Sequence, residues 1–105
     1  MVSARIRIGQ VPSDYELKGS DVVIRSRLGE QTLWIMVSET ELRRVMADHS
    51  MPAAILAFGA ARDVQTAARS AFENGRKLDS VLDKDGYTLL GAKLRVHAVD
   101  FGLVT

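Results

Sequence analysis

The feature that most constrains this chain is a helical stretch between Ser50 and Gly75, with the sequence SMPAAILAFGAARDVQTAARSAFENG. Ser50 and Pro52 suit the start of a helix, and Gly75 suits its end. Apolar residues recur at steps of three and four, which predicts one buried stripe. The stripe consists of Ala54, Phe58, Ala61, Val64, Ala68 and Phe72. An unbroken helix over 52–74 would be about 34 Å long, close to the diameter of a small domain, so a break or bend at Gly59 is plausible.

The composition is that of one ordinary globular domain. The chain has 105 residues, of which 47% are hydrophobic and 26% charged, and this balance is enough for a single core. A net charge of +1 predicts no bulk attraction to nucleic acid or membranes. The absence of cysteine excludes disulfides and thiolate chemistry, which suits a cytoplasmic protein. We find no signal peptide and no apolar run that could span a bilayer.

Alternation of polar and apolar residues predicts three strands in the first part of the chain. They cover Ser3 to Ile8, Asp21 to Leu28 and Gln31 to Val37. The turn signal Gly29-Glu30 joins the second and third strands in an antiparallel hairpin. Residues 9–20 read as a loop because they contain proline, glycine and serine. Leu33, Ile35 and Val37 should face the core, whereas Thr32, Trp34 and Met36 should face away.

A capping box formed by Ser38 and Glu41 predicts a further helix, from Glu39 to about Asp48. Residues 77–82 suit either a helical turn or a short strand, and residues 83–86 suit a turn. Residues 87–90 suit a strand that Gly91 breaks, and 93–101 alternate as a last strand. These elements predict an α+β fold, with an antiparallel sheet of four to five strands and two helices packed on one face.

The order of these patterns resembles a known family. The matching features are a charged strand, Asp21-Val22-Val23-Ile24, and a helix start, Val37-Ser38-x-x-x-Leu42; then Ala57-Phe58-x-x-x-Arg62 with Ala68-x-x-x-Phe72, and a closing strand that ends near Asp100. Over about residues 21–101 the chain is similar to a family of short, uncharacterised proteobacterial proteins of unknown function, the Shewanella-type structural-genomics family. The resemblance implies a bacterial protein with a small α+β fold and no known activity.

The sequence contains no pattern that indicates catalysis or metal binding. His49 and His97 are the only histidines, and no nucleophile motif surrounds any serine. The segment Asp83-x-Asp85-Gly86 resembles part of a calcium loop, but Val81 and Ala92 would then occupy positions that require oxygen ligands. We therefore expect no catalytic residues, no metal and no cofactor, and an enzyme is the least favoured class of function.

The polar face of the predicted sheet is basic and carries the only tryptophan. Basic residues alternate along the strands, so their side chains should lie opposite the helices. The candidate binding surface consists of Arg5, Arg7, Arg25, Arg27, Trp34, Met36, Lys93, Arg95 and His97. A solvated outer face is the ordinary interpretation, because arginine side chains also cover apolar surface. A register shift of one residue would bury Trp34 instead.

Charges outside this surface affect its interpretation. Asp21, Glu30 and Asp100 could neutralise part of its positive field. A second basic stripe, Arg62, Arg69 and Arg76, follows the edge of the long helix's apolar arc. We interpret this stripe as a solvated flank, with the rim of an interface as the alternative.

Two functions could use the candidate surface. The favoured one is a non-enzymatic protein-interaction or regulatory module, which binds a protein partner or associates with itself as a homodimer through Trp34 and Met36. The alternative is binding of single-stranded nucleic acid by phosphate attraction and base stacking. It is less favoured because the chain lacks a basic excess. Neither function involves a membrane, and only nucleic-acid binding should weaken steeply with salt.

Overall fold

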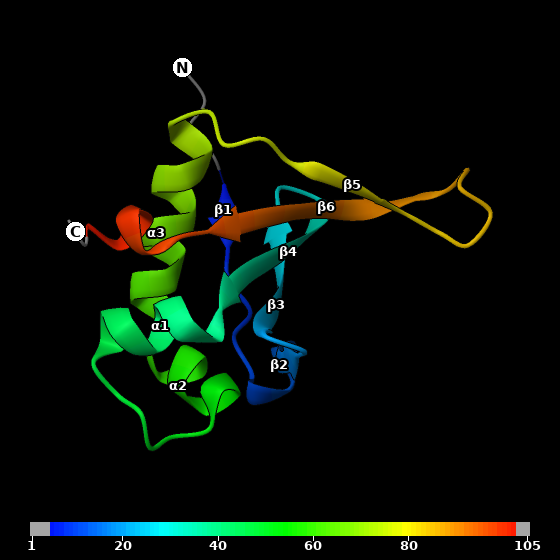
Figure 1. Ribbon diagram of the computed structural model, residues 1–105. Helices are drawn as coiled ribbons and strands as arrows, with labels where there is room; N and C mark the ends of the chain where they lie inside the picture. Colours follow the sequence, from blue (N-terminus) through cyan, green and yellow to red (C-terminus); the bar gives the residue numbers. More distant parts are fainter. Residues whose placement is uncertain (1–4, 103–105) are drawn as a thin grey trace.

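A computed structural model describes residues 5–102 and shows three helices beside a twisted sheet (Figure 1). The six strands have the order β1-β3-β4-β6-β5, with β2 also paired to β3. The strands are β1 (Ile6–Arg7), β2 (Tyr15–Lys18), β3 (Asp21–Leu28), β4 (Gln31–Ser38), β5 (Asp79–Leu82) and β6 (Leu89–Val96). The helices are α1 (Glu39–Met46), α2 (Ala53–Gly59) and α3 (Ala61–Glu73). The predicted α+β class is confirmed, but four to five strands and two helices were too few.

The hairpin of β3 and β4 forms as the sequence predicts. Its eight paired positions run antiparallel from Asp21 opposite Ser38 to Leu28 opposite Gln31. Gly29 has a φ of 61°, a conformation that glycine adopts without steric cost, which explains the turn. The predicted core positions of β4, namely Leu33, Ile35 and Val37, are all 0% exposed. Alternation therefore predicted both the strand and the face that it buries.

The prediction of an entirely antiparallel sheet is wrong, because β4 and β6 are parallel. Their register runs from Leu33 opposite Ala92 to Val37 opposite Val96. All three helices and β5 lie between these two strands in the sequence. Such a long connection lets the chain return in the same direction, which a short turn cannot do.

The start of the chain forms a broken edge strand against β3. Ile6 and Ile8 are buried as predicted, whereas Ser3 and Ala4 lie outside the described residues. Residues 9–20 are not simply a loop, because they contain a short 3-10 helix (Pro12–Asp14) and β2. The strand β2 escaped prediction because only Tyr15, among its four residues, is buried. The Tyr15 hydroxyl donates to the Gly9 carbonyl at 2.7 Å, and burial raises its pKa to about 12.

The long helical stretch is divided where a break was plausible. Helix α2 ends at Gly59, and Ala60, with a φ of −99° and a ψ of 19°, joins it to α3. The most buried face is also turned slightly from the predicted stripe. Its residues are Ala53, Leu56, Ala57, Val64, Ala67, Ala68 and Ala71. Phe58 and Phe72 are only partly buried, and Phe58 packs edge-on against Tyr15 with ring centroids 5.3 Å apart.

The last third of the chain differs most from prediction. The ambiguous residues 77–82 contain the strand β5, not a helical turn. Gly91 does not break a strand, since β6 runs through it from Leu89 to Val96. The last strand ends at Val96 and not at Phe101, because a 3-10 helix covers Ala98–Phe101.

The core lies between the three helices and one face of the sheet. Apolar residues from β1, β3, β4 and β6 form one cluster with the helical alanines. Small alanine side chains let α2 and α3 lie close to the sheet. Within residues 5–102, no helix is long and apolar enough to cross a membrane. No helix of the described part of the chain covers the other sheet face (Figure 1), and we call it the open face.

Candidate interaction surface

Strand register gathers most of the predicted binding residues on the open face. In one row across the sheet, Arg25 lies opposite Trp34, which lies opposite Lys93. In the next row Val23 lies opposite Met36, which lies opposite Arg95. At the sheet edge Arg7 lies opposite Arg27. Trp34 and Met36 are half-buried and alternate with fully buried neighbours, which matches the predicted register.

Arg95 is held by an acid on the same face. Its Nη1 and Nη2 atoms donate to the two Asp21 carboxylate oxygens at 3.0 Å and 2.8 Å. This bidentate hydrogen bond lowers the pKa of Asp21 and raises the pKa of Arg95. Asp21 therefore neutralises the positive charge of Arg95 and not that of the other arginines. Because Arg95 is held in this pair, it is poorly placed to bind another molecule.

His97 is also engaged within the protein. Its Nδ1 atom lies 3.2 Å from Glu41 Oε1, and the Ala98 N–H donates to the other oxygen of the same carboxylate. The capping box is thus only half formed. Ser38 Oγ accepts from the Glu41 N–H at 3.1 Å, but the Glu41 side chain turns to the end of β6 instead of to Ser38. Glu41 therefore links α1 to the residues that follow β6. Because His97 contacts Glu41, we no longer count His97 as part of the candidate surface.

The centre of the open face contains a shallow apolar hollow of about 330 Å³. Its lining residues are Lys18, Val23, Trp34, Met36, Val81 and Lys93. Four of these side chains are apolar and two are lysines, of which Lys18 lies 3.9 Å from the Glu16 carboxylate. Lys18 and Val81 come from β2 and β5, which the sequence did not clearly predict. We call this feature the apolar hollow.

A second hollow of about 240 Å³ lies on the β1 side and is lined by three arginines and Asp14. Arg7, Arg25, Arg27 and Thr32 line it from the open face, together with residues of the segment 8–14. Arg25 therefore stands between this hollow and the tryptophan beside it in the sheet. Arg5, the remaining predicted residue, precedes β1 and lines a different cavity at the sheet edge.

The hairpin of β5 and β6 projects from the body of the protein (Figure 1). Strand β6 pairs with β4 only from Ala92 onward, so residues 82–90 extend beyond the neighbouring strands. We call residues 82–90 the arm. Its large apolar side chains are exposed: Leu82 by 48%, Tyr87 by 91%, Leu89 by 55% and Leu90 by 47%. The arm was not predicted, although the sequence has apolar residues on both sides of the turn at Gly86.

Hydrogen bonds give the tip of the arm a defined turn. The Asp83 N–H donates to the Thr88 carbonyl at 2.9 Å, and the Gly86 N–H donates to the Asp83 carbonyl at 3.0 Å. Hydrogen bonds to the Asp83 carboxylate, chiefly from the Thr88 side chain, lower its pKa. The turn over residues 83–86 contains Lys84 between Asp83 and Asp85, so its formal net charge is −1 at neutral pH. The predicted turn over 83–86 is confirmed, and no calcium pattern is needed to explain it.

The described residues show no arrangement for metal binding. Among residues 5–102, no group of three or more histidine, aspartate or glutamate side chains could hold a metal ion. Comparison with known proteins gives no further assignment: no protein-family model, curated protein or solved structure matches the chain. The resemblance stated above therefore stays a prediction, and function must be inferred from the surface itself.

The Asp21–Arg95 pair predicts how stability depends on pH. We expect Asp21→Asn to lower the free energy of unfolding by about 1 kcal/mol near neutral pH, because solvent screens a pair whose arginine is 40% exposed. The Asp21 carboxyl has a lowered pKa in the folded state. Its contribution is therefore present above the unfolded pKa of about 4 and is lost as the pH falls through the folded value.

Urea unfolding at neutral pH and in acid, below the folded-state pKa of Asp21, measures this effect. The loss caused by Asp21→Asn should nearly disappear in acid. Asp79→Asn, which changes an exposed acid on β5, is the matched control and should alter stability little at either pH. An equal loss from Asp21→Asn at both pH values would contradict the role assigned to the charged carboxylate.

Proposed function

We propose that this protein is a non-enzymatic interaction module that forms a homodimer through its arm and open face. The single observation that carries the proposal is the arm, with four large apolar side chains exposed at its projecting end. Exposed apolar patches in soluble proteins commonly mark interaction sites. A two-stranded hairpin is also only marginally stable by itself, so contact with another surface would stabilise it.

The chemistry of the arm is complementary to that of the apolar hollow. The arm offers Tyr87 and three leucines beside a turn that contains Asp83 and Asp85. The hollow offers apolar side chains together with Lys18 and Lys93. Apolar contact would therefore be accompanied by charge attraction. Since the same chain carries both surfaces, we assign a second copy as the partner.

Two-fold symmetry allows both arms to be used at once. In a dimer of this kind, the arm of each protomer lies over the open face of the other, and the interface closes without leaving a free site. Such an arrangement would cover Trp34 and Met36, the anchors that the sequence analysis favoured.

The arm is tested by Tyr87→Ser combined with Leu89→Ser. We expect this double variant to weaken dimerisation at least about tenfold, because large exposed side chains often carry most of an interface's binding energy. Sedimentation velocity over a range of protein concentrations measures the monomer–dimer equilibrium. Trp34 is the only tryptophan, so its fluorescence reports on the open face. Its emission should move to shorter wavelength with concentration in the unaltered protein but not in the Tyr87→Ser, Leu89→Ser variant.

The matched control changes two exposed apolar residues elsewhere. Ile55 on α2 and Val99 in the last 3-10 helix are 56% and 65% exposed. The double variant Ile55→Ser with Val99→Ser should dimerise like the unaltered chain. A protein that stays monomeric at every concentration, or a control variant that loses dimerisation equally, would refute the proposal.

Single-stranded nucleic acid is a second candidate partner, favoured by the basic hollow of Arg7, Arg25 and Arg27 beside Trp34. Phosphates would meet the arginines while a base stacks on the indole. The support for this function is reduced because Arg95 pairs with Asp21 and His97 contacts Glu41 within the protein. Binding of a thymidine oligonucleotide that falls steeply with salt and requires Arg25 would favour it over self-association.

A further inference from the structure

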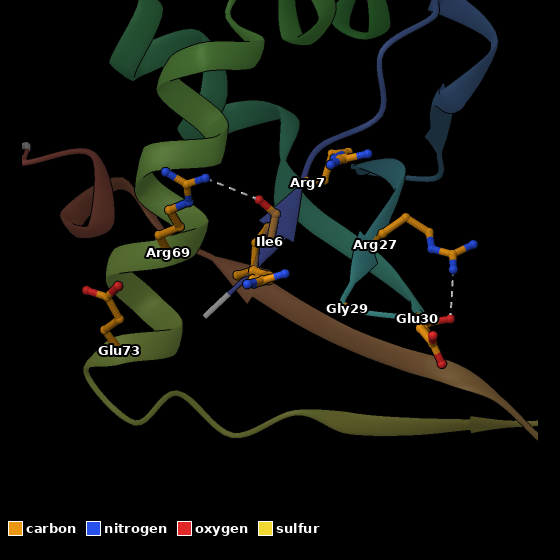
Figure 2. A pocket seen from close by; sticks show the side chains of 8 residues that line it. Ile6, Arg7, Arg27, Gly29, Glu30, Arg69 and Glu73 are labelled. Atoms are coloured by element: carbon orange, nitrogen blue, oxygen red, sulfur yellow. Dashed lines mark hydrogen bonds between the residues drawn. The ribbon is translucent and has the colours of Figure 1, made fainter. Parts of the chain in front are cut away.

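A further cavity lies at the β1 edge of the sheet, outside the arm and the apolar hollow. It has a volume of about 900 Å³ and is formed by β1, α3 and the turn between β3 and β4. Figure 2 shows its lining side chains. They are Arg5, Ile6, Arg7, Arg27, Gly29, Glu30, Arg69 and Glu73. We call this cavity the arginine cavity.

Helix α3 covers the hydrogen-bonding edge of β1 beside this cavity. The Ile8 N–H donates to Gln65 Oε1 at 2.8 Å, and Arg69 Nη2 donates to the Ile6 carbonyl at 3.5 Å. These side chains form hydrogen bonds with backbone groups that an added strand would need for pairing. The cavity is therefore unsuited to extending the sheet, and its occupant must be recognised by side-chain chemistry.

Positive charge is concentrated in the arginine cavity. Its four arginines and two glutamates give a net charge of +2, whereas the whole chain carries only +1. Arg7 and Arg27 also lie directly opposite each other in the sheet. Like charges at such positions repel, and an anion between them would relieve the repulsion.

The guanidinium groups retain many donors for a ligand. The Arg27 group donates through Nη2 to the Glu30 carbonyl at 2.8 Å, and the Arg69 group has the single bond to Ile6. Each guanidinium carries five N–H donors in a fixed plane. Within residues 5–102, none of the four arginines forms an ion pair with a carboxylate. An anion with several oxygen atoms could therefore accept bidentate hydrogen bonds from more than one of them.

We propose that the arginine cavity binds a small ligand that carries two or more linked phosphate groups. Arginine matches the geometry and charge of phosphate oxygens. The volume falls in the range of ordinary small-ligand pockets and exceeds what one phosphate needs. Glu30 and Glu73 flank the arginines from opposite sides (Figure 2). These carboxylates would repel the continuing backbone of a polymer, which favours a short oligophosphate over a nucleic-acid strand.

Calorimetric titration of the full chain with inorganic tripolyphosphate at low ionic strength tests this site. The double variant Arg5→Gln with Arg69→Gln should weaken binding by about tenfold or more. The control, Arg44→Gln with Arg62→Gln, removes the same charge from exposed helix positions outside the cavity. It should change the dissociation constant by less than about twofold.

A variant with the opposite effect separates binding from folding. Glu73→Gln removes a repulsive carboxylate, so it should bind tripolyphosphate several times more tightly than the unaltered chain. The proposal is overturned if the unaltered protein does not bind tripolyphosphate, or if the control loses as much affinity as the cavity variant. Tighter binding of a thymidine oligonucleotide at equal phosphate concentration, with the same dependence on Arg5 and Arg69, would overturn the small-ligand assignment.

Discussion

Replacing Gly91 with alanine is expected to lower the free energy of unfolding by about 2–3 kcal/mol. Gly91 lies in β6, where a Cβ atom would fall on the Thr32 carbonyl oxygen and 2.5 Å from Cζ3 of Trp34. The indole could turn away, but the Thr32 carbonyl belongs to the backbone of the neighbouring strand. Relief would therefore require β4 and β6 to separate, which disturbs the parallel pairing at the sheet centre.

Denaturant unfolding measures this loss, and Gly59→Ala is its control. No atom lies within 4 Å of the Cβ position at Gly59, which ends α2 without a positive φ. Alanine there should be neutral or stabilise the protein by up to about 1 kcal/mol. Trp34 emission should also change in the native state of Gly91→Ala alone. A Gly91→Ala protein as stable as the unaltered chain would contradict the described packing.

Replacing Asp100 with alanine should also cost about 2–3 kcal/mol. The Asp100 side chain is only 5% exposed and accepts from Arg76 Nη1 at 2.9 Å, from Arg76 Nη2 at 3.1 Å and from the His97 N–H at 2.7 Å. Its removal leaves the Arg76 charge, which is 30% exposed, without its acid. Breaking a buried ion pair costs about 3–5 kcal/mol, and partial exposure of Arg76 reduces that figure.

A double-mutant cycle isolates the Arg76–Asp100 interaction. Unfolding is compared for Asp100→Ala, Arg76→Ala and the combined variant, and a coupling of about 1–2 kcal/mol is expected. Asp63→Ala, at an exposed position on α3, should have little effect. Losses that simply add in the combined variant would show that the two side chains do not act as a pair. This pairing also replaces the interpretation of Arg76 as part of a solvated flank.

Local patterns predicted the elements whose causes are local. The hairpin of β3 and β4 follows from alternation and one glycine turn, and the N–H of Glu41 meets Ser38 as a helix start requires. The division near Gly59 follows from length and a weak helix former. Nothing local encodes the direction in which β6 returns beside β4, so the parallel pair was missed.

The candidate surface, too, could be predicted only where its cause is local in the sequence. Alternation placed Arg25, Trp34 and Lys93 on one face, and the register aligns them. Alternation could not reveal that Asp21 forms an ion pair with Arg95, which is 74 positions away in the sequence. It also could not reveal that Glu41 contacts His97, which is 56 positions away. The apolar hollow could not be predicted because two of its lining residues come from β2 and β5, which the sequence did not clearly predict.

The parallel contact between β4 and β6 predicts an order of folding for this chain. The hairpin of β3 and β4 closes a very short loop, so it can form early at low entropic cost. All three helices separate β6 from β4 in the sequence. Pairing of these two strands therefore closes a long loop, which slows the final step of folding. Until then one edge of β4 has unpaired backbone groups in the middle of the future sheet. Partly folded molecules are consequently most prone to wrong strand pairing at β4, and the helices that cover its buried face limit that risk.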